Sequence, residues 1–351
     1  MNAHALGVVL ATIAAVLFGL TTPFIAWLGG GVGALTTACL LYVGAALGVS
    51  LARAAGIGRG MSGHALRLKD LATIVGMAVC GAAIAPVLLV LGLARTTTVA
   101  ASLALNGEVL FTILLAVAFF REPWRGRVLA GIVAILLGGV LLTLDQDLAT
   151  GDSSGGEGLL LVLAATLFWG IDNTLSRNVS EASPLSVVAA KGALGALITM
   201  VVAVALGEDL PRLSATLSLM AIGATGYGAS LVVYLLAQRR LGAARTGSIF
   251  GLAPFIGAAL AFAAGEREAG WLTAIGAACF GVGIWIHARE PHAHAHVHAP
   301  IEHEHGHRHD DGHHDHHHDA VFVGSHSHPH AHARVEHTHP HAPDLHHRHP
   351  H

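Results

Sequence analysis

The sequence predicts an all-α integral membrane protein, with ten transmembrane helices arranged as two inverted five-helix repeats and followed by a disordered tail. Three observations lead to this prediction: the scarcity of charge, a series of ten apolar segments, and sequence matches between the two halves. Of the 351 residues, 53% are hydrophobic and 12% are Asp, Glu, Lys or Arg, about half the charged fraction of an ordinary soluble domain. So few charged side chains cannot cover a soluble fold, and the body is therefore expected to lie in a lipid bilayer.

Ten segments are long and apolar enough to be membrane-spanning helices, which need about 20 mostly apolar residues. They are rich in Leu, Ala, Val, Ile and Gly, and the small residues among these let helices pack closely where lipid removes the hydrophobic driving force. In chain order the segments cover residues 6–28, 33–52, 70–92, 97–120, 128–144, 158–177, 185–206, 214–237, 246–264 and 270–287.

The basic residues between the segments predict the orientation, because cytoplasmic loops are enriched in Lys and Arg. If the N-terminus lies in the cytoplasm, the outer ends of the segments carry only Arg95, Arg212 and Arg267. The cytoplasmic ends then carry twelve basic residues: Arg53, Arg59, Arg67, Lys69, Arg121, Arg125, Arg127, Arg177, Arg239, Arg240, Arg245 and Arg289. Because the number of segments is even, the C-terminus is also expected in the cytoplasm.

The two halves of the body match each other in sequence. Four matches occur in the same order in both halves: Ala-Ala-X-Leu-Phe at 14–18 and 164–168, Ala-Arg-Thr at 94–96 and 244–246, Glu122 with Glu266, and Gly139 with Gly283. A repeat of five spans is odd, so the second copy must be inverted in the membrane, a common transporter design. We therefore predict a first repeat at 1–144, an acidic periplasmic linker at 145–157, a second repeat at 158–289, and a tail at 290–351.

Several motifs resemble those of a known family. The spans that end in Ala-Phe-Phe-Arg-Glu-Pro (118–123) and Ala-Ala-Gly-Glu-Arg-Glu (263–268), together with the segments 167–177 and 244–260, are similar to EamA-type transporters of the drug/metabolite transporter superfamily. The resemblance extends to a bacterial subgroup with a His-rich C-terminal tail. It implies a secondary carrier of the bacterial inner membrane, whose cavity is lined by spans three, four, eight and nine. It implies no particular substrate.

Few ionisable or amide side chains fall inside the spans, and each is a functional candidate because its burial in lipid is costly. Asn106 and Glu108 lie in span four, where Asn106-Gly107 also weakens the helix. Asp172 and Asn173 lie in span six, and Lys191 lies in span seven. Asp172 and Lys191 lie at similar depth, so they are expected either to form an ion pair or to bind substrate directly. Glu108 lies deeper and has no partner nearby in sequence. We predict that it is the principal transport residue, the alternative being a structural carboxyl.

Helix-breaking residues indicate the same region, because interrupted helices at matched places in two halves often mark a carrier's site. They are Pro86 in span three, Gly223, Gly226 and Gly228 in span eight, and Gly251 with Pro254 in span nine. Tyr227 and Tyr234 either line the cavity or belong to the core, and Glu122 and Glu266 are expected to cap helix ends. The predicted substrate-binding residues are thus Asn106, Glu108, Asp172, Asn173, Lys191, Tyr227 and Pro254.

The tail contains 24 of the 27 histidines and almost no apolar residues, so it is expected to be disordered. Neutral imidazole is a good ligand for Zn, Ni, Cu and Co ions, and nearby Asp and Glu residues add oxygen ligands. The predicted metal ligands are His292, His294, His296, His298, His303, His305, His307, His309, His313, His314, His316, His317 and His318.

Two main functions remain open from the sequence, and both need the lipid bilayer as partner. The first is a carrier of small organic solutes, acting in efflux, whose tail buffers or senses metal. The second is an exporter of Ni, Co or Zn ions, although the spans contain no clustered carboxylates and Lys191 would repel a cation. A non-transporting metal-binding receptor is a third possibility. No required cofactor, nucleic-acid partner or enzymatic activity is expected, because no basic cluster, nucleophile–base arrangement or phosphate loop occurs.

Overall fold

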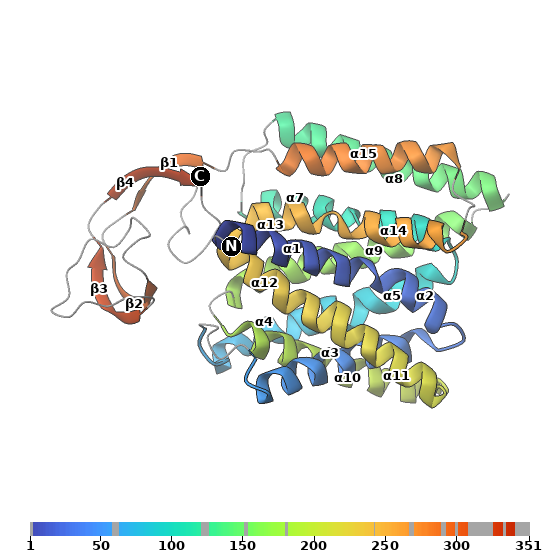
Figure 1. The fold of residues 1–351 in the computed structure, drawn as a ribbon, viewed down its shortest axis with the longest axis horizontal. Helices are drawn as coiled ribbons and strands as arrows, with labels where there is room; N and C mark the ends of the chain where they lie inside the picture. The colour runs from blue at the N-terminus through green and yellow to red at the C-terminus, as the bar shows by residue number, and fades with distance from the viewer. Residues whose placement is uncertain are drawn as a thin grey trace. The chain divides into compact units, whose positions relative to one another are not determined.

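The computed structural model describes most of the chain, which divides into two compact units: residues 1–290 with 350–351, and residues 291–349. In the first unit the described residues are 3–57, 63–120, 126–150, 154–179, 182–241, 243–266 and 270–288. In the second they are 293–298, 301–307, 326–332 and 335–340. The first unit is helical and the second contains short strands (Figure 1).

The first half of the helical unit begins with α1 and ends with α8. Its elements are α1 (Ala3–Gly19), α2 (Thr21–Leu28), α3 (Ala34–Ala54), η1 (Leu68–Asp70), α4 (Leu71–Met77), η2 (Ala78–Ile84), α5 (Ala85–Leu93), α6 (Thr98–Ala104), α7 (Gly107–Phe120) and α8 (Gly126–Thr150). Most of the breaks between them have a local cause. Pro23, for example, lacks the N–H that would bond the Gly19 carbonyl, at the point where α1 ends and α2 begins.

The second half repeats this series of elements. It contains α9 (Ser154–Ser176), η3 (Arg177–Val179), α10 (Pro184–Ala205), α11 (Leu213–Ile222), η4 (Gly223–Ala229), α12 (Ser230–Leu241), α13 (Ala243–Phe250), α14 (Ala253–Ala263) and α15 (Trp271–Ala288). The elements η2 and η4 are π-helical and occupy corresponding places in the two halves.

Helices occupy each of the ten predicted segments. Within the described residues, six helices are long and apolar enough to cross a membrane, and four apolar helices are shorter. The long ones are Ala5–Leu28, Ala34–Ala54, Leu68–Leu93, Gly156–Ser176, Pro184–Ala205 and Leu213–Ala237. The shorter ones are Thr98–Thr112, Leu129–Asp145, Ala253–Ala263 and Trp271–Ile286. A multi-pass membrane protein accounts for so many apolar helices.

The two halves pack against each other through reciprocal contacts. Helix α1 packs against α12 as α9 packs against α5, and α3 packs against η4 as α10 packs against η2. Three further pairs join corresponding spans directly: α3 with α10, α6 of span four with α14 of span nine, and α8 with α15, the last at one edge of the unit (Figure 1). Such reciprocity is what a duplicated five-helix unit would produce.

The crossing of α3 with α11 and η4 depends on two glycines. A Cβ atom on Gly223 would overlap the Leu41 carbonyl, and one on Gly44 would overlap the Met220 carbonyl. The helices therefore touch backbone to backbone, which is how small residues stabilise helix pairs in lipid.

The Gly223→Ala variant is expected to lose about 1–3 kcal/mol of unfolding free energy, because the added methyl group overfills this contact. Thermal unfolding of the detergent-solubilised protein measures the loss. The matched control is Gly139→Ala, since no atom lies within 4 Å of a Cβ at that position in α8. Equal stability of the two variants would contradict the close crossing.

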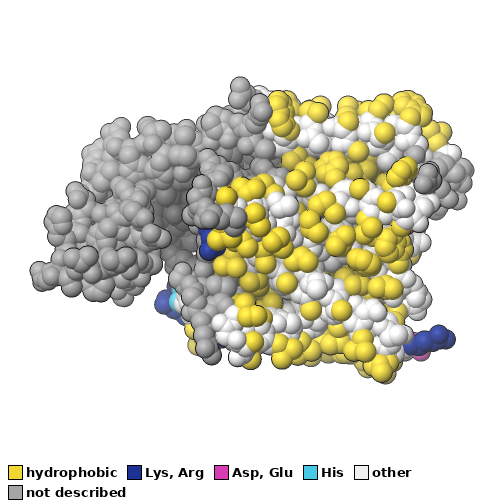
Figure 2. All heavy atoms as spheres, in the orientation of Figure 1, with side chains coloured by type: hydrophobic (Ala, Val, Ile, Leu, Met, Phe, Trp, Pro, Cys, Tyr) yellow, Lys and Arg dark blue, Asp and Glu magenta, His cyan; other side chains and the backbone are white. Residues whose placement is uncertain are grey.

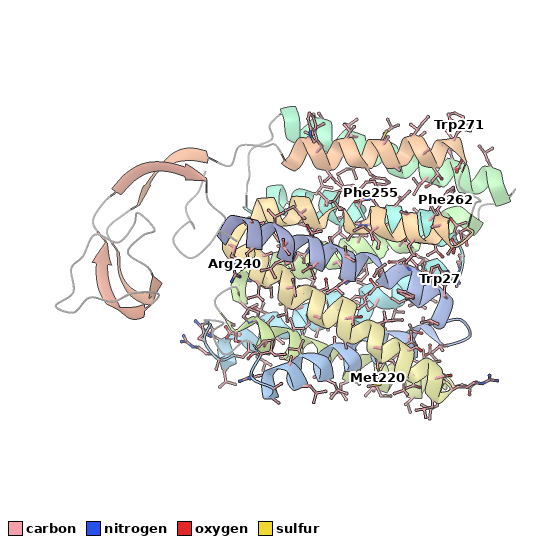
Figure 3. The ribbon with its side chains drawn as sticks, viewed as in Figure 1. Trp27, Met220, Arg240, Phe255, Phe262 and Trp271 are labelled. Carbon is pink, nitrogen blue, oxygen red and sulfur yellow. The ribbon has the colours of Figure 1, made fainter. Side chains whose placement is uncertain are left out.

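The surface of the helical unit is largely hydrophobic, with Lys and Arg side chains at its edges (Figure 2). Trp27 and Trp271 are exposed at one end of the helices and Arg240 at the opposite end (Figure 3). We call these the tryptophan end and the arginine end; Arg53, in the last turn of α3, also belongs to the arginine end. Tryptophan is typical of the membrane–water interface, and the exposed aliphatic side chains between the two ends suit contact with lipid.

The second unit contains four strands where the composition predicts disorder. Strand β1 (Ala293–His298) pairs antiparallel with β4 (Val335–Pro340), and β2 (Ile301–His307) pairs antiparallel with β3 (His326–His332). The difference has a physical reason, because alternation of His with other residues has the period-two pattern of a strand. Of the predicted metal ligands, His294, His296, His298, His303, His305 and His307 lie in β1 and β2, and the others lie outside the described residues.

Candidate functional site

The predicted site in span four lies at a break between α6 and α7. Helix α6 ends at Ala104, and the Asn106 N–H bonds the Leu103 carbonyl instead of continuing the α-helical pattern. The Asn106 side chain is buried; its Nδ2 donates to the same carbonyl, and its Oδ1 has no partner among the described residues. Asn-Gly therefore interrupts this helix, as the sequence indicates, and leaves a polar atom inside the protein.

Glu108 stands in the first turn of α7 and is half-buried. Its Oε1 accepts a hydrogen bond of 2.6 Å from Nδ2 of Asn173 on α9. The sequence predicts a carboxylate without a neighbour, but helix packing supplies one from a residue 65 positions away. Asn173 itself is exposed, so this pair borders open space rather than the packed core.

Asp172 and Lys191 form the ion pair that the sequence predicts as one of two alternatives. Asp172 is 5% exposed and Lys191 is 6% exposed, and Lys191 Nζ donates to Asp172 Oδ2. Asp172 Oδ1 is buried without a partner among the described residues. The carboxylate rests on Gly81 of η2, where any Cβ atom would overlap it. The pair thus fastens α9 to α10 and to the π-helix of span three.

The Gly81 carbonyl joins the same cluster. It accepts one hydrogen bond of 2.6 Å from the Tyr42 hydroxyl and another of 3.0 Å from Trp169 Nε1. Both donors are buried, so their bonds to this carbonyl satisfy groups that water does not reach. Tyr42, Gly81 and Trp169 are not among the site residues predicted from the sequence. The available signal was an aromatic residue with a polar tip inside an apolar span.

A chain of aromatic rings surrounds this region. Phe18 contacts Trp169, Tyr227 and Phe250, with ring centroids 6.4, 5.8 and 5.3 Å apart. Tyr227 also contacts Tyr42 at 5.3 Å. These side chains come from α1, α3, α9, η4 and α13, so both halves of the protein contribute to the cluster.

The chain of rings continues to α12. Tyr234 of α12 contacts Phe250 at 5.0 Å. Tyr227 is buried among rings, as expected for the core position that is one of its two alternatives.

The polar groups sit where the helices of both halves depart from regular α-helix. The π-helices η2 and η4 lie in spans three and eight, and π-helical turns often occur at functional sites. Span nine breaks between α13 and α14 as span four breaks between α6 and α7. Pro254 is buried in the first turn of α14, where its missing N–H ends the hydrogen-bond ladder.

With one lysine and two carboxylates in their ionised forms, Asp172, Lys191 and Glu108 give the region an excess of one negative charge. Lys191 neutralises Asp172, whereas Glu108 has only the neutral Asn173 as a described hydrogen-bond partner. Its carboxylate therefore keeps acceptor capacity for a cationic or hydrogen-bond-donating group.

The two glutamates expected to cap helix ends differ in what the structure describes. Glu266 does cap a helix: its Oε2 accepts from the Thr98 N–H, at the start of α6, over 2.8 Å. Glu122 lies outside the described residues.

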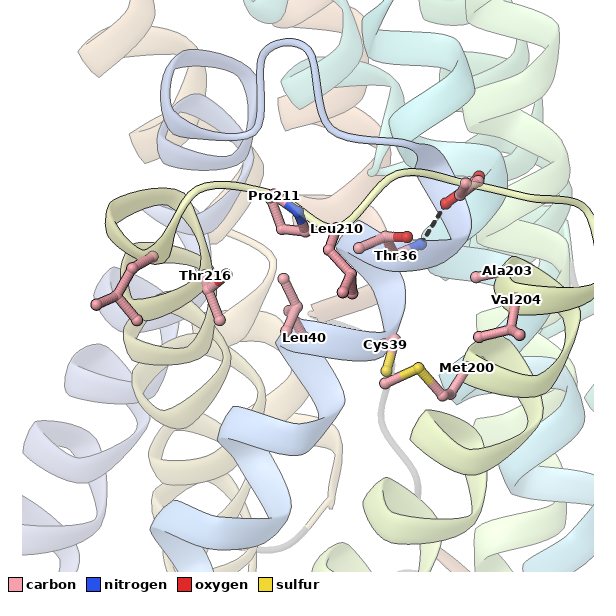
Figure 4. Close-up of a pocket in the computed structure, with 11 residues that line it drawn as sticks. Thr36, Cys39, Leu40, Met200, Ala203, Val204, Leu210, Pro211 and Thr216 are labelled. Atoms are coloured by element: carbon pink, nitrogen blue, oxygen red, sulfur yellow. Dashed lines mark hydrogen bonds between the residues drawn. The ribbon is translucent and has the colours of Figure 1, made fainter.

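A cavity of about 300 Å³ lies at the tryptophan end, away from Glu108 (Figure 4). Thr36, Cys39 and Leu40 of α3 form one wall, and Met200, Ala203 and Val204 of α10 form another. Leu210 and Pro211 help to line it together with Glu208, whose carboxylate bonds the start of α3. Its lining is largely apolar, and none of the predicted substrate-binding residues borders it.

Comparison with known proteins gives a match along most of the chain. The model of the EamA-like transporter family matches twice, at residues 5–144 and at residues 156–289. The two matches coincide closely with the halves predicted from the internal sequence repeats.

Individual relatives match over shorter stretches. An uncharacterized transporter of Methanothermobacter thermautotrophicus is 34% identical over 208 residues, which are 58% of this chain and 60% of that protein. A probable amino-acid metabolite efflux pump of Escherichia coli is 32% identical over 101 residues, which are 29% of this chain and 33% of that protein. The chain therefore spans less than two thirds of the length of these curated relatives.

A solved crystal structure has a similar fold. It superposes with a TM-score of 0.57 at 20% identity and covers 80% of this chain and 96% of that chain. At this identity the likeness concerns the fold alone.

Proposed function

The chain belongs to the EamA-like transporter family, and from this premise we propose that it is a secondary transporter that exports small organic solutes. The observation that supports the proposal most is the polar site around Glu108, where broken and π-helical segments of both halves meet. Carriers built from repeats bind their substrates at such interruptions near the middle of the membrane.

In this proposal Glu108 binds the transported solute or a coupling proton, and Asn173 orients its carboxylate through the 2.6 Å hydrogen bond. Asn106 and Tyr227 are proposed to contact the solute as well, and Pro254 to maintain the break in span nine. The Asp172–Lys191 pair fixes the local arrangement of helices, since each charge neutralises the other.

The name of one relative supports an amino-acid-like solute and outward transport. The Escherichia coli protein is a probable amino-acid metabolite efflux pump. A site with one lysine, two carboxylates and several aromatic rings suits a solute that has both charged and apolar parts.

We propose ten membrane crossings arranged as two inverted repeats, in the bacterial inner membrane, with both termini in the cytoplasm. The basic residues support this orientation because twelve of them fall at the ends of the spans that it assigns to the cytoplasm. The reciprocal packing of the two halves supports the duplication. The arginine end then faces the cytoplasm and the tryptophan end faces outward.

We propose that the His-rich tail binds divalent transition metals and buffers or regulates transport. Its strands align histidines in register: His294 with His339, His296 with His337, His303 with His330, His305 with His328, and His307 with His326. This pairing of histidines supports metal binding, since Zn²⁺ commonly takes four ligands and imidazole is a good one.

The second candidate function is export of Ni, Co or Zn ions, and the tail is the observation in its favour. Among the described residues, no group of three or more His, Cys, Asp or Glu side chains comes together as a metal site. A metal-binding receptor without transport has only the tail in its support. Export of an organic solute also accounts for the polar site around Glu108 and for the interrupted helices beside it, which the tail-based functions leave unexplained.

A growth screen separates these functions. A strain lacking the gene is complemented with the full-length protein or with a protein truncated after Arg289, and is then exposed to amino acids, antimetabolites and metal salts. For an organic-solute exporter, both proteins are expected to restore tolerance to at least one organic compound. Any response of that tolerance to zinc or nickel weakens in the truncated protein. Metal tolerance as the sole phenotype would favour the metal exporter.

A further inference from the structure

Three carboxylates at the tryptophan end bond the first turns of helices in the other half of the protein. Glu208 follows α10 and bonds α3, Glu266 follows α14 and bonds α6, and Asp145 of α8 bonds α15. Each contact thus joins the end of a helix in one half to the start of a helix in the other.

The Glu208 contact is bidentate. Its Oε2 accepts from the Thr36 N–H over 2.7 Å and its Oε1 from the Leu35 N–H over 3.2 Å. Helix α3 has no side-chain cap of its own at Gly33, and a Cβ at Gly33 would overlap the Glu208 carboxylate. Gly33 therefore leaves the space in which this carboxylate sits.

The Asp145 contact has the same design. Asp145 Oδ2 accepts from the Gly270 N–H over 2.7 Å and from the Thr273 hydroxyl over 2.6 Å. A Cβ at Gly270 would overlap the Asp145 carboxylate, so a glycine again makes room for the contact.

The Glu266 contact goes beyond the capping that α6 needs. Thr97 already caps α6, because its hydroxyl accepts from the Ala100 N–H. The bond from the Thr98 N–H to Glu266 therefore serves mainly to tie the end of span nine to the start of span four. These two spans are the ones that break beside the proposed site.

Spans four and nine are arranged differently at the two ends. Helix α6 packs against α14 toward the tryptophan end, whereas no comparable packing joins α7 to α13 in the described part of the chain. Glu108 is half-buried and Asn173 is exposed on the arginine side of the break. Among the described residues, hydrogen bonds also join the two halves at the arginine end, from Arg53 to Ser186 and from Ser183 to His64. These bonds lie beside α3 and α10 and do not involve spans four and nine.

We propose that Glu208, Glu266 and Asp145 form an outer latch, which holds the tryptophan end of the transporter closed while the Glu108 site is open toward the arginine end. A carboxylate at a helix start is stabilised by the unpaired N–H groups and the helix dipole. Release of the latch lets spans four and nine separate at the outer end. This inference rests on the proposed transport function and adds the residues that control its outward-facing state.

The test measures the accessibility of two cysteine reporters in a protein whose native Cys39, Cys80 and Cys279 are changed to Ala. Ser102→Cys reports on the outer side, because Ser102 is buried one turn below the Thr98–Glu266 bond. Asn173→Cys reports on the inner side, because Asn173 is exposed. A membrane-impermeant maleimide is applied to intact cells for the first reporter and to inside-out vesicles for the second.

Three variants break the latch in different ways: Gly33→Ala and Gly270→Ala displace a carboxylate by a methyl group, and Glu266→Ala removes one. Each is expected to speed labelling of the outer reporter by about tenfold, the shift in the equilibrium constant that loss of one charge-assisted hydrogen bond would give. The inner reporter stays close to its original rate in the single variants, because the inward-open state remains the major one. It is expected to slow about tenfold in a protein that carries all three changes. Matched controls are Gly30→Ala, where the nearest atom to a Cβ is 4.0 Å away, and Glu157→Ala, an exposed carboxylate in the first turn of α9.

Two results would overturn the latch. Unchanged labelling of both reporters in folded variants would show that the contacts do not control access. Faster labelling of the outer reporter with unchanged labelling of the inner one in the protein that carries all three changes would show only local loosening of helix ends. Neither reporter needs a transported solute, so failure of the latch is distinguishable from failure of the proposed transport function.

Discussion

Replacement of Glu108 by Gln is expected to reduce solute transport to the level of vesicles without the protein. Glu108 is the carboxylate of the site that lacks a described cationic partner, and Gln cannot supply its charge or take up a proton from it. Gln keeps the size of the side chain and can still accept from Asn173, so the variant is expected to fold and insert normally. Transport by purified protein in proteoliposomes, at equal protein content, measures the effect.

The control for Glu108→Gln is Glu157→Gln, the same change at an exposed position in the first turn of α9. It is expected to transport like the wild type. Wild-type transport by Glu108→Gln would refute the assignment of Glu108. Loss of folded Glu108→Gln protein would instead indicate a structural carboxyl.

Neutralising one member of the Asp172–Lys191 pair is expected to destabilise the protein by about 3–5 kcal/mol, because the remaining charge stays buried without a partner. Asp172→Asn and Lys191→Met should each lower the yield of folded protein and its unfolding temperature. The fraction that does fold is expected to transport better than Glu108→Gln.

The double variant Asp172→Asn/Lys191→Met distinguishes a structural pair from two substrate ligands. If the residues act as a pair, the double variant recovers part of the stability that each single variant loses. Thermal unfolding of all four proteins completes the double-mutant cycle. Additive losses of stability would contradict the coupling, and stable single variants with abolished transport would assign both residues to substrate binding.

The helical segments could be predicted because apolar runs of this length leave few alternatives. The break at Asn106 and Gly107 and the buried Asp172–Lys191 pair could be predicted as well. Asn-Gly weakens a helix locally, and two opposite charges at similar membrane depth have a strong reason to meet.

The contact between Glu108 and Asn173 could not be predicted from the sequence, because it depends on how α7 packs against α9. The role of the Gly81 carbonyl as a hydrogen-bond acceptor could not be predicted either. Every residue has a backbone carbonyl, and only the fold brings the Tyr42 and Trp169 donors to this one. The pairing of the four strand segments in the tail could not be predicted from composition, because composition ignores the order of residues and the strands follow a period-two pattern.

The central claim, export of an organic solute through the Glu108 site, is tested most directly by uptake into inside-out membrane vesicles. The probes are a panel of radiolabelled amino acids together with ⁶⁵Zn²⁺ and ⁶³Ni²⁺, supplied to vesicles that contain the wild-type protein, the protein truncated after Arg289, or Glu108→Gln. We predict that wild-type and truncated proteins accumulate at least one amino acid, that Glu108→Gln does not, and that none accumulates either metal ion. Metal uptake by the truncated protein that is lost in Glu108→Gln would contradict the account and make the metal exporter the correct function.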